Sequence, residues 1–222
     1  MKWKKIAFIS VIILAVFLIY LLTIDRKIFY LDMGDQLSIS SNSYGVQLKE
    51  HFSSLGKLEK YVDGFKKDDL RITDIMRMIE TNEKVLMNEK EQTIKNALIK
   101  ADLLTLSVGL NDFTYKIDYV TKAELYDIAD EVLYDLEDLF VIIREYCKED
   151  IVYIGIPYLG KSEFQEVFDY LNEKIELLCN DYKIKFVPTS GSVSFENGVI
   201  SPVSSSKIYD RIKLGLNHSL LK

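Results

Sequence analysis

The chain has 222 residues, two cysteines and a formal net charge of −6. This length suffices for one α/β domain with a sizeable core. The charge is unevenly divided, because residues 1–27 carry five basic side chains and one acidic side chain, and the remainder carries a net charge of −10. A domain this acidic is a poor candidate for binding nucleic acid, whose phosphates are met by Lys and Arg. Anionic lipid would also repel it, except at a tether.

The N-terminal segment has the composition of a membrane anchor. Residues 6–22 contain no charged side chain, Thr23 and Ile24 extend the apolar run, and three lysines precede it. The run is just long enough to span a bilayer, and no A-x-A-like cleavage site follows it. We predict an uncleaved signal-anchor over residues 6–24, with a cleaved signal peptide as the alternative. The basic N-terminus favours a cytoplasmic start and an extracytoplasmic domain over residues 28–222, although Arg26 and Lys27 count against this orientation.

The rest of the chain alternates strand and helix patterns. Short β-branched or aromatic segments, mostly without alternation, are typical of strands covered on both faces; they are Ile28–Met33, Leu58–Phe65, Leu103–Val108, Ile151–Ile156 and Ile184–Val187. Amphipathic helix patterns cover Lys122–Tyr146, Glu163–Leu178 and Ser204–Leu216, and residues 82–93 resemble a small hairpin turning at residues 88–90. This order predicts an α/β fold, a three-layer α/β/α sandwich around a flavodoxin-like five-stranded parallel sheet. The functional crevice is expected at the carboxyl ends of the strands.

Two features of these helices each allow two interpretations. The outer face of Lys122–Tyr146 is acidic, which favours a solvated surface over a calcium or partner site; its acids include Glu124, Asp127, Asp130, Asp135 and Asp138. Cys147 and Cys179 each lie near the end of a predicted helix that precedes a strand. They either pair in an oxidising compartment or remain buried free thiols.

Residues 155–162 fit the phosphate-binding pattern G-x-x-x-x-G-K-[ST] and lie between a strand and a helix. A phosphate-cradling loop needs free backbone amides, but Pro157 has no amide hydrogen, and Tyr158 and Leu159 are bulky. We interpret the match as a strand end followed by a helix that Ser162 caps.

Two other motifs follow the first and third strands. Gly34-Asp35 ends the first strand, and Gly109 and Asn111 belong to a G-x-N-D sequence after the third. Together they resemble the SGNH (GDSL-type) hydrolase superfamily, in particular its small bacterial membrane-tethered members, from Lys27 to about residue 216. The resemblance implies ester hydrolysis by a Ser after Gly-Asp. It implies a His base near the C-terminus, followed by Pro and preceded three positions earlier by Asp. It also implies an oxyanion hole built from the Ser amide, a Gly after the second strand and the Asn.

The sequence departs from this family pattern at each catalytic position. Gln36 stands in place of the nucleophile, and an amide nitrogen is not a competent acyl acceptor. Asp69 stands where the oxyanion-hole Gly is expected, Ser201 precedes Pro202 where His is expected, and Gly198 stands where Asp is expected.

The chain has only two histidines, and neither lies near a predicted catalytic loop. His51 falls on a helix pattern between the first two predicted strands, and His218 lies in the C-terminal tail. We therefore expect a catalytically inactive, membrane-anchored protein of the bacterial cell envelope, with no cofactor and no metal. Its crevice, rimmed by Gln36, Asp69, Asn111 and Ser201, would bind an envelope glycan, an acyl ligand or a protein partner.

The alternative hypothesis is an ester or acyl hydrolase that acts on envelope or lipid esters through relocated residues. Displaced nucleophiles would come from the serines just downstream of Gln36, namely Ser38, Ser40, Ser41 and Ser43, but they would still need a base. Two carboxylates at a suitable spacing would support glycan cleavage instead, and the candidates are Asp32, Asp35, Asp69 and Asp112. The simpler interpretation of these acids is that they cap turns.

Overall fold

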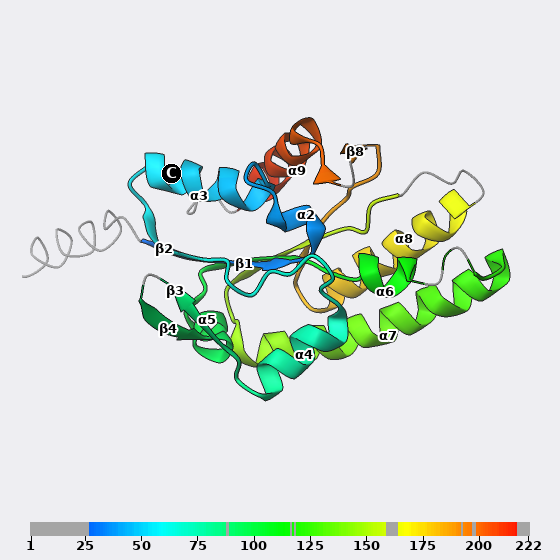
Figure 1. Ribbon diagram of the computed structural model, residues 1–222, viewed down its shortest axis with the longest axis horizontal. Coiled ribbons are helices and arrows are strands. Elements are labelled where there is room, and N and C mark those ends of the chain that lie inside the picture. Colours follow the sequence, from blue (N-terminus) through cyan, green and yellow to red (C-terminus); the bar gives the residue numbers. More distant parts are fainter. Residues whose placement is uncertain are drawn as a thin grey trace, which may run out of the picture.

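A computed structural model gives the arrangement of the chain as three layers (Figure 1). It describes residues 27–87, 89–115, 117, 119–158, 164–191, 193–196 and 199–216. The predicted membrane segment, residues 6–24, lies outside these ranges, as do Gly198, His218 and residues 159–162 of the phosphate-binding pattern, with the predicted cap Ser162. Among the helices of the described ranges, none is both long and apolar enough to cross a bilayer.

The central layer is the predicted five-stranded sheet, in the order β2-β1-β5-β6-β7 with all neighbours parallel. This order confirms the flavodoxin-like prediction. The strands are β1 (Ile28–Gly34), β2 (Leu58–Val62), β5 (Leu103–Ser107), β6 (Asp150–Ile154) and β7 (Lys185–Val187). The second strand ends three residues earlier than predicted, because the chain turns away at Asp63 and Gly64. Gly64 then packs so closely on the hairpin that an added Cβ would lie 2.9 Å from the Val85 side chain.

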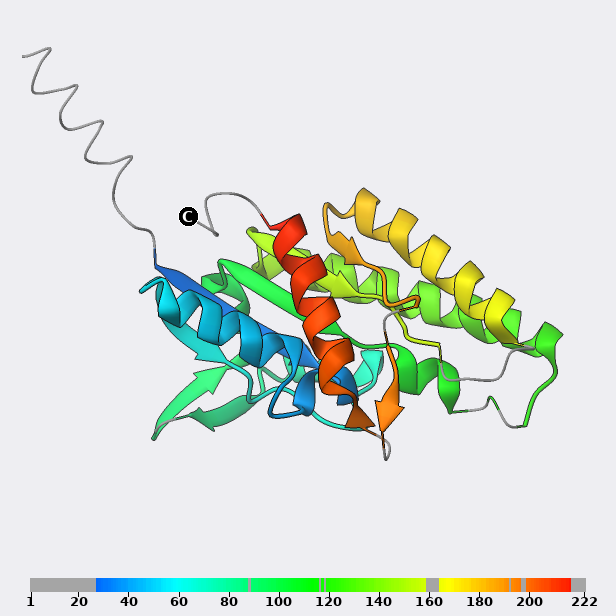
Figure 2. The same ribbon diagram turned by 90° about the horizontal axis from the view of Figure 1, so that it is seen from above.

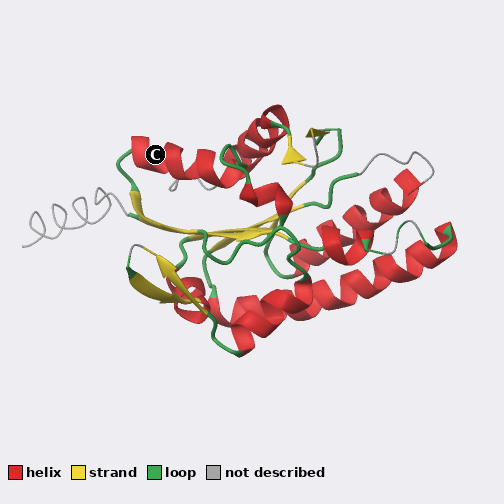
Figure 3. Ribbon diagram, in the orientation of Figure 1, coloured by secondary structure: helices red, strands yellow, loops and turns green. Residues whose placement is uncertain are grey.

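Helices cover both faces of the sheet (Figures 1 and 3). One face carries α2 (Gln36–Ile39), α3 (Tyr44–Ser54) and α9 (Pro202–Gly215). The other carries α4 (Ile72–Glu80), α5 (Ile94–Lys100), α7 (Lys122–Tyr146) and α8 (Gln165–Asp181). The remaining elements are α6 (Leu110–Thr114), the hairpin β3 (Lys84–Met87) and β4 (Lys90–Thr93), and the small pair β8 (Phe195–Glu196) and β9 (Val199–Ile200).

Alternate residues of β1 point into two separate cores, as the two-residue period of a strand requires. Leu31 and Met33 pack under α4, α5, α7 and α8, while Ile28 and Tyr30 pack under α3 and α9. Both faces of this strand are therefore buried, which explains its nearly continuous apolar sequence.

Local signals at the helix ends explain their bounds. Thr121 and Glu124 form a reciprocal capping box that starts α7, and this helix matches its predicted range. The helix α9 starts at Pro202, two residues before the prediction, because Ser201 caps it and Pro suits the first helical position. Cys147 and Cys179 are both buried free thiols. Within the described ranges no three His, Cys, Asp or Glu side chains are grouped to hold a metal ion, so the calcium alternative for the acidic face of α7 gains no support there.

Candidate functional site

The nucleophile position lies where the chain leaves the sheet. β1 ends at Gly34, Asp35 caps α2 by accepting a hydrogen bond from the Leu37 amide at 3.1 Å, and Gln36 is the first helical residue. The Gln36 side chain is half-buried. Gly34 is required by the close approach of β5, since a Cβ at this position would lie 2.1 Å from the Ser107 hydroxyl. The Gly-Asp motif thus fixes the strand-to-helix turn independently of the residue that follows it.

Asp35 is an unusual N-cap because its side chain is completely buried. Burial raises the pKa of this carboxyl to about 7, and the hydrogen bond from Leu37 and the nearby Ser107 hydroxyl only partly oppose the rise. Its Oδ2 atom has no well-formed hydrogen bond, and the hydroxyls of Tyr44 and Ser107 share this property. This buried carboxyl at the start of α2 therefore changes its protonation near neutral pH.

The G-x-N-D motif organises the neighbouring strand end. Gly109 has a φ of +106° at the start of α6, a conformation that favours glycine. Asn111 donates both hydrogens of its amide, one to the Asp68 carbonyl and one to the Leu70 carbonyl, each at 3.1 Å. Since one Nδ2 carries only two hydrogens, this amide has no hydrogen left for an oxyanion.

Asp112 ties the same motif to α4. Its carboxylate accepts a hydrogen bond from the Ile72 amide, with the shorter contact at 3.2 Å. Partial burial raises its pKa to about 6. The motif therefore holds the loop between β2 and α4 in place.

The loop between β2 and α4 also forms a backbone hydrogen bond with β1. The Lys67 amide donates to the Gly34 carbonyl at 3.2 Å. Asp69, the residue predicted to replace the oxyanion-hole Gly, is exposed on this loop. The family resemblance predicts an oxyanion donor after the second strand, near Asp69, and two residues before Asp69 the Lys67 amide is already bonded within the fold.

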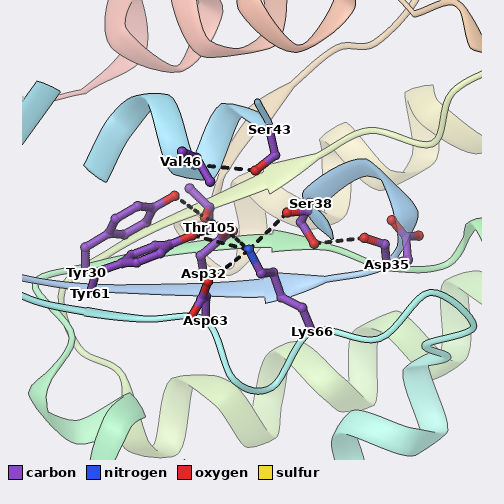
Figure 4. Close-up of polar contacts among 10 residues, drawn as sticks. All are labelled: Tyr30, Asp32, Asp35, Ser38, Ser43, Val46, Tyr61, Asp63, Lys66 and Thr105. Carbon is purple, nitrogen blue, oxygen red and sulfur yellow. Dashed lines mark hydrogen bonds and ion pairs between the residues drawn. The ribbon is translucent and has the colours of Figure 1, made fainter. Parts of the chain in front are cut away.

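A buried ionic network lies behind α2 (Figure 4). The Asp32 carboxylate accepts hydrogen bonds from Thr105 at 2.7 Å, from Tyr61 at 3.0 Å and from the Lys66 ammonium at 3.0 Å. Lys66 also donates to the Ser38 carbonyl at 3.0 Å. Burial raises the pKa of Asp32, and the Lys66 ammonium opposes that rise. The sequence did not identify the ion pair of Asp32 and Lys66. The signal for it was a single Asp within an apolar strand, because a buried carboxylate needs a cation beside it.

The position predicted for the base lies in a cluster of serines. Ser201 is buried, caps α9, and shares hydrogen bonds of 2.9 Å with the hydroxyls of Ser194 and Ser204. β9, which immediately precedes Ser201, contacts α2. The fold therefore brings the segment that precedes α9 against α2, the helix that begins at Gln36.

Within the described ranges, the structure places His51 between α3 and α9. His51 lies on α3, with its ring 5.9 Å from that of Phe52 and 6.2 Å from that of Tyr209 on α9. His218 lies outside the described ranges. Near the crevice loop, the Arg71 guanidinium stacks on the exposed Tyr115 ring at 4.6 Å. These two side chains, which the sequence did not single out, add an aromatic and cationic rim close to Asn111.

No family model and no curated protein matches the sequence. The fold, however, is similar to that of known esterases. The acetylxylan esterase Axe2 from Geobacillus stearothermophilus has 12% identity and a TM-score of 0.68 over 90% of this chain and 98% of its own. The acetyl xylan esterase AlAXEase has 13% identity and a TM-score of 0.63 over 85% of this chain and 100% of its own. The chain therefore has the fold of the SGNH hydrolases, which these acetylxylan esterases share.

Proposed function

We propose that this protein is a membrane-anchored, extracytoplasmic SGNH-hydrolase-like domain that binds a cell-envelope ligand at its crevice without hydrolysing it. The observation that supports this proposal most strongly is the hydrogen bonding of the Asn111 side chain. Its side-chain amide, the one side-chain oxyanion donor of the family pattern that the sequence retains, is committed to the carbonyls of Asp68 and Leu70.

The residues at the expected positions of the nucleophile and the base support the same conclusion. Gln36 occupies the turn where a Ser would attack, and the carboxamide is not a competent acyl acceptor. Ser201 occupies the position of the base, and a hydroxyl does not take up a proton at neutral pH. His51, the histidine within the described ranges, packs against α9 through Tyr209.

Two of the four candidate relocated nucleophiles, Ser38 and Ser43, find little support. Ser38 is buried and its hydroxyl donates to the Asp35 carbonyl at 2.8 Å. Ser43 is also buried, and its hydroxyl caps α3 by accepting from the Val46 amide. A serine that is buried and bonded to backbone has neither the access nor the base that nucleophilic catalysis needs.

The rim of the crevice suits a carbohydrate. The half-buried Gln36 offers an amide donor and acceptor, and the exposed Asp69 offers a carboxylate acceptor. Tyr115, which is 60% exposed, offers a ring face next to the Arg71 guanidinium. The similar esterases act on acetylated xylan by name. We therefore propose a glycan of the cell envelope, acetylated or not, as the ligand class.

The anchor completes the proposal. The apolar run over residues 6–24, preceded by three lysines, supports a single membrane span with a cytoplasmic N-terminus. The domain would then lie at the outer face of the membrane, where envelope glycans are within its reach.

Two measurements on the full-length protein in neutral detergent test this function. The first exposes it to a fluorophosphonate probe and to acetylated xylo-oligosaccharides, with Axe2 as the positive control. We expect no labelling and no acetate release. Turnover that a single Ser→Ala change in the crevice abolishes would contradict the proposal.

The second measurement titrates acetylated and deacetylated xylo-oligosaccharides and soluble peptidoglycan fragments by calorimetry. We expect saturable binding of at least one of these glycans. Arg71→Ala and Gln36→Ala should each weaken it about tenfold, since each removes a contact at the rim. Gln47→Ala, which removes a half-buried glutamine side chain of α3, is the matched control. Absence of binding to all of these probes would argue against a glycan ligand.

A further inference from the structure

Side chains of α7 and α8 line a groove. These two helices lie on the opposite face of the sheet from α3 and α9 (Figures 1 and 2). The volume of the groove is about 410 Å³. Leu133 and Leu178 lie in the groove, and two large apolar side chains remain open to solvent, since Tyr134 is 71% exposed and Leu177 is 60% exposed. Large apolar side chains that face each other across a groove are typical of a docking surface.

The net negative charge of the domain lies on these same two helices, α7 and α8. α7 has eight acidic and two basic side chains, and α8 has five acidic and one basic, which gives a joint net charge of −10. This equals the net charge of all residues from 28 to 222. The rest of the domain is therefore neutral on balance, and the field of the molecule is concentrated around this groove.

Hydrogen bonds hold two of the groove acids in fixed positions. The Tyr170 hydroxyl donates to Asp130 at 2.6 Å, and the Tyr182 hydroxyl donates to Glu137 at 3.2 Å. Lys174 lies 5.6 Å from the centre of the Tyr170 ring, so an ammonium group already lies over an aromatic face in this groove. Oriented carboxylates beside aromatic rings form a surface that receives Lys and Arg side chains.

We infer that the groove between α7 and α8 docks a positively charged amphipathic segment of a partner protein. An apolar side chain of the partner would enter between Tyr134 and Leu177. Its Lys or Arg side chains would pair with the acids that line the groove, Asp130, Glu137 and Asp181. This inference does not rest on the proposed glycan site, because the groove lies on the outer surface of the helical layer and the crevice lies at the strand ends.

The negative charge of the groove disfavours other acidic molecules as its ligands. A second copy of this chain that docked through the same two helices would present the same acidic face and would be repelled. Anionic lipid and nucleic acid would be repelled for the same reason. The partner must therefore carry positive charge, and the open Leu177 and Tyr134 side chains require that it also carry apolar ones.

The test uses the full-length protein in nanodiscs of neutral lipid and a synthetic 14-residue peptide of Leu and Lys with Leu at helical spacing. One leucine is photoreactive, and empty nanodiscs measure binding to lipid. Two further peptides separate charge from apolar contact, one with Glu in place of Lys and one with Ser in place of Leu. We expect the Leu-Lys peptide to bind more tightly than both, and its cross-links to map to α7 and α8.

Variants connect the binding to the groove. The triple change Asp130→Asn, Glu137→Gln and Asp181→Asn should weaken binding about tenfold and reduce its salt dependence. The matched triple Glu50→Gln, Glu59→Gln and Glu80→Gln removes the same charge from exposed positions on other elements and should leave the affinity within about twofold. Leu177→Ser should weaken the Leu-Lys peptide but not the Ser-Lys peptide. Equal effects of the two triples, equal affinity for the Ser-Lys peptide, or cross-links outside α7 and α8 would each overturn the inference.

Discussion

The Lys66 ammonium lies 3.0 Å from the Asp32 carboxylate, and the Asp32 side chain is fully buried. The pair joins the loop after β2 to β1, and the bond from Lys66 to the Ser38 carbonyl extends the connection to α2. It therefore fixes the loop that supplies the carbonyls held by Asn111. A buried pair of this kind is costly to form, and the removal of one partner is costlier still.

We expect Lys66→Met to destabilise the protein by about 3–5 kcal/mol, because it leaves the Asp32 carboxylate buried without its cation. The loss should grow as the pH rises, since without the ammonium the pKa of Asp32 rises further and the ionised form becomes the unfavourable one. The double variant Asp32→Asn, Lys66→Met should recover most of the loss. Denaturant unfolding of the full-length protein at pH 5 and pH 8 measures these differences.

The control for this pair is Lys67→Met. Lys67 is 44% exposed and lies 3.7 Å from Glu83, so its loss should cost less than about 1 kcal/mol. If Lys66→Met is no worse than Lys67→Met, or no worse than the double variant, the pair does not stabilise the loop.

The raised pKa of Asp35 predicts a second way in which the stability of the protein depends on pH. Its folded-state pKa of about 7 lies above the usual value of 3.8. The folded state therefore holds this proton more tightly than the unfolded state, and the stability present below about pH 4 is lost as the pH rises through 7. Asp35→Asn keeps the capping oxygen but cannot ionise. We expect it to be more stable than the native protein at pH 8 by up to about 4 kcal/mol, and to lose this advantage near pH 4.

The measurement for Asp35 is the difference in unfolding free energy between native and variant protein at several pH values from 4 to 8. This difference isolates Asp35 from Asp112, whose pKa is also raised, to about 6. Asp127→Asn, on the exposed face of α7, controls for the loss of one negative charge. A difference that stays constant with pH would show that Asp35 is ionised in the fold throughout this range.

The parts of the site that the sequence predicted are those that depend on strand ends. Gly34 and Asn111 follow two strands whose apolar runs mark them as buried and parallel, and parallel strands end at one edge of a sheet. In the structure Gly34 pairs with Ser107, two residues before Gly109, and the strand before Ser201 contacts α2. The functional roles assigned to these positions stay predictions.

The hydrogen-bond partners of these residues could not be predicted from the sequence. The partners of Asn111 are backbone carbonyls, which every residue carries, so no side-chain pattern identifies them. The buried Asp32 implied a cation, but any lysine in a loop at that sheet edge would have met the requirement. The cluster of Ser194, Ser201 and Ser204 likewise depends on the path of the segment before α9.

Close packing predicts opposite outcomes for two glycines that both lie in helices. A Cβ on Gly45 in α3 would lie 2.0 Å from the buried Asp32 carboxylate, whereas a Cβ on Gly215 in α9 would meet only the flexible Lys185 side chain at 2.8 Å. We expect Gly45→Ala to destabilise the protein by about 2 kcal/mol or more. Gly215→Ala should be neutral or stabilising by up to about 1 kcal/mol, because Ala favours helices over Gly. Thermal unfolding of the two variants side by side measures this contrast, and equal stabilities would mean that α3 moves away from Asp32 without cost.

Restoration of the family residues tests the assignment of the whole site. We expect the triple variant Gln36→Ser, Gly198→Asp and Ser201→His to gain fluorophosphonate labelling, whereas Gln36→Ser alone should not, because the hydroxyl is a weak nucleophile without its base. Its hydrolysis of acetylated xylo-oligosaccharides should remain at least about 100-fold slower than that of Axe2, the usual cost of one missing oxyanion donor, because Asn111 still donates to Asp68 and Leu70. Labelling by Gln36→Ser alone would mean that a base is already present at the crevice. Hydrolysis as fast as that of Axe2 would mean that Asn111 exchanges its backbone partners for the oxyanion at no cost, and the main support for a non-hydrolytic domain would then be lost.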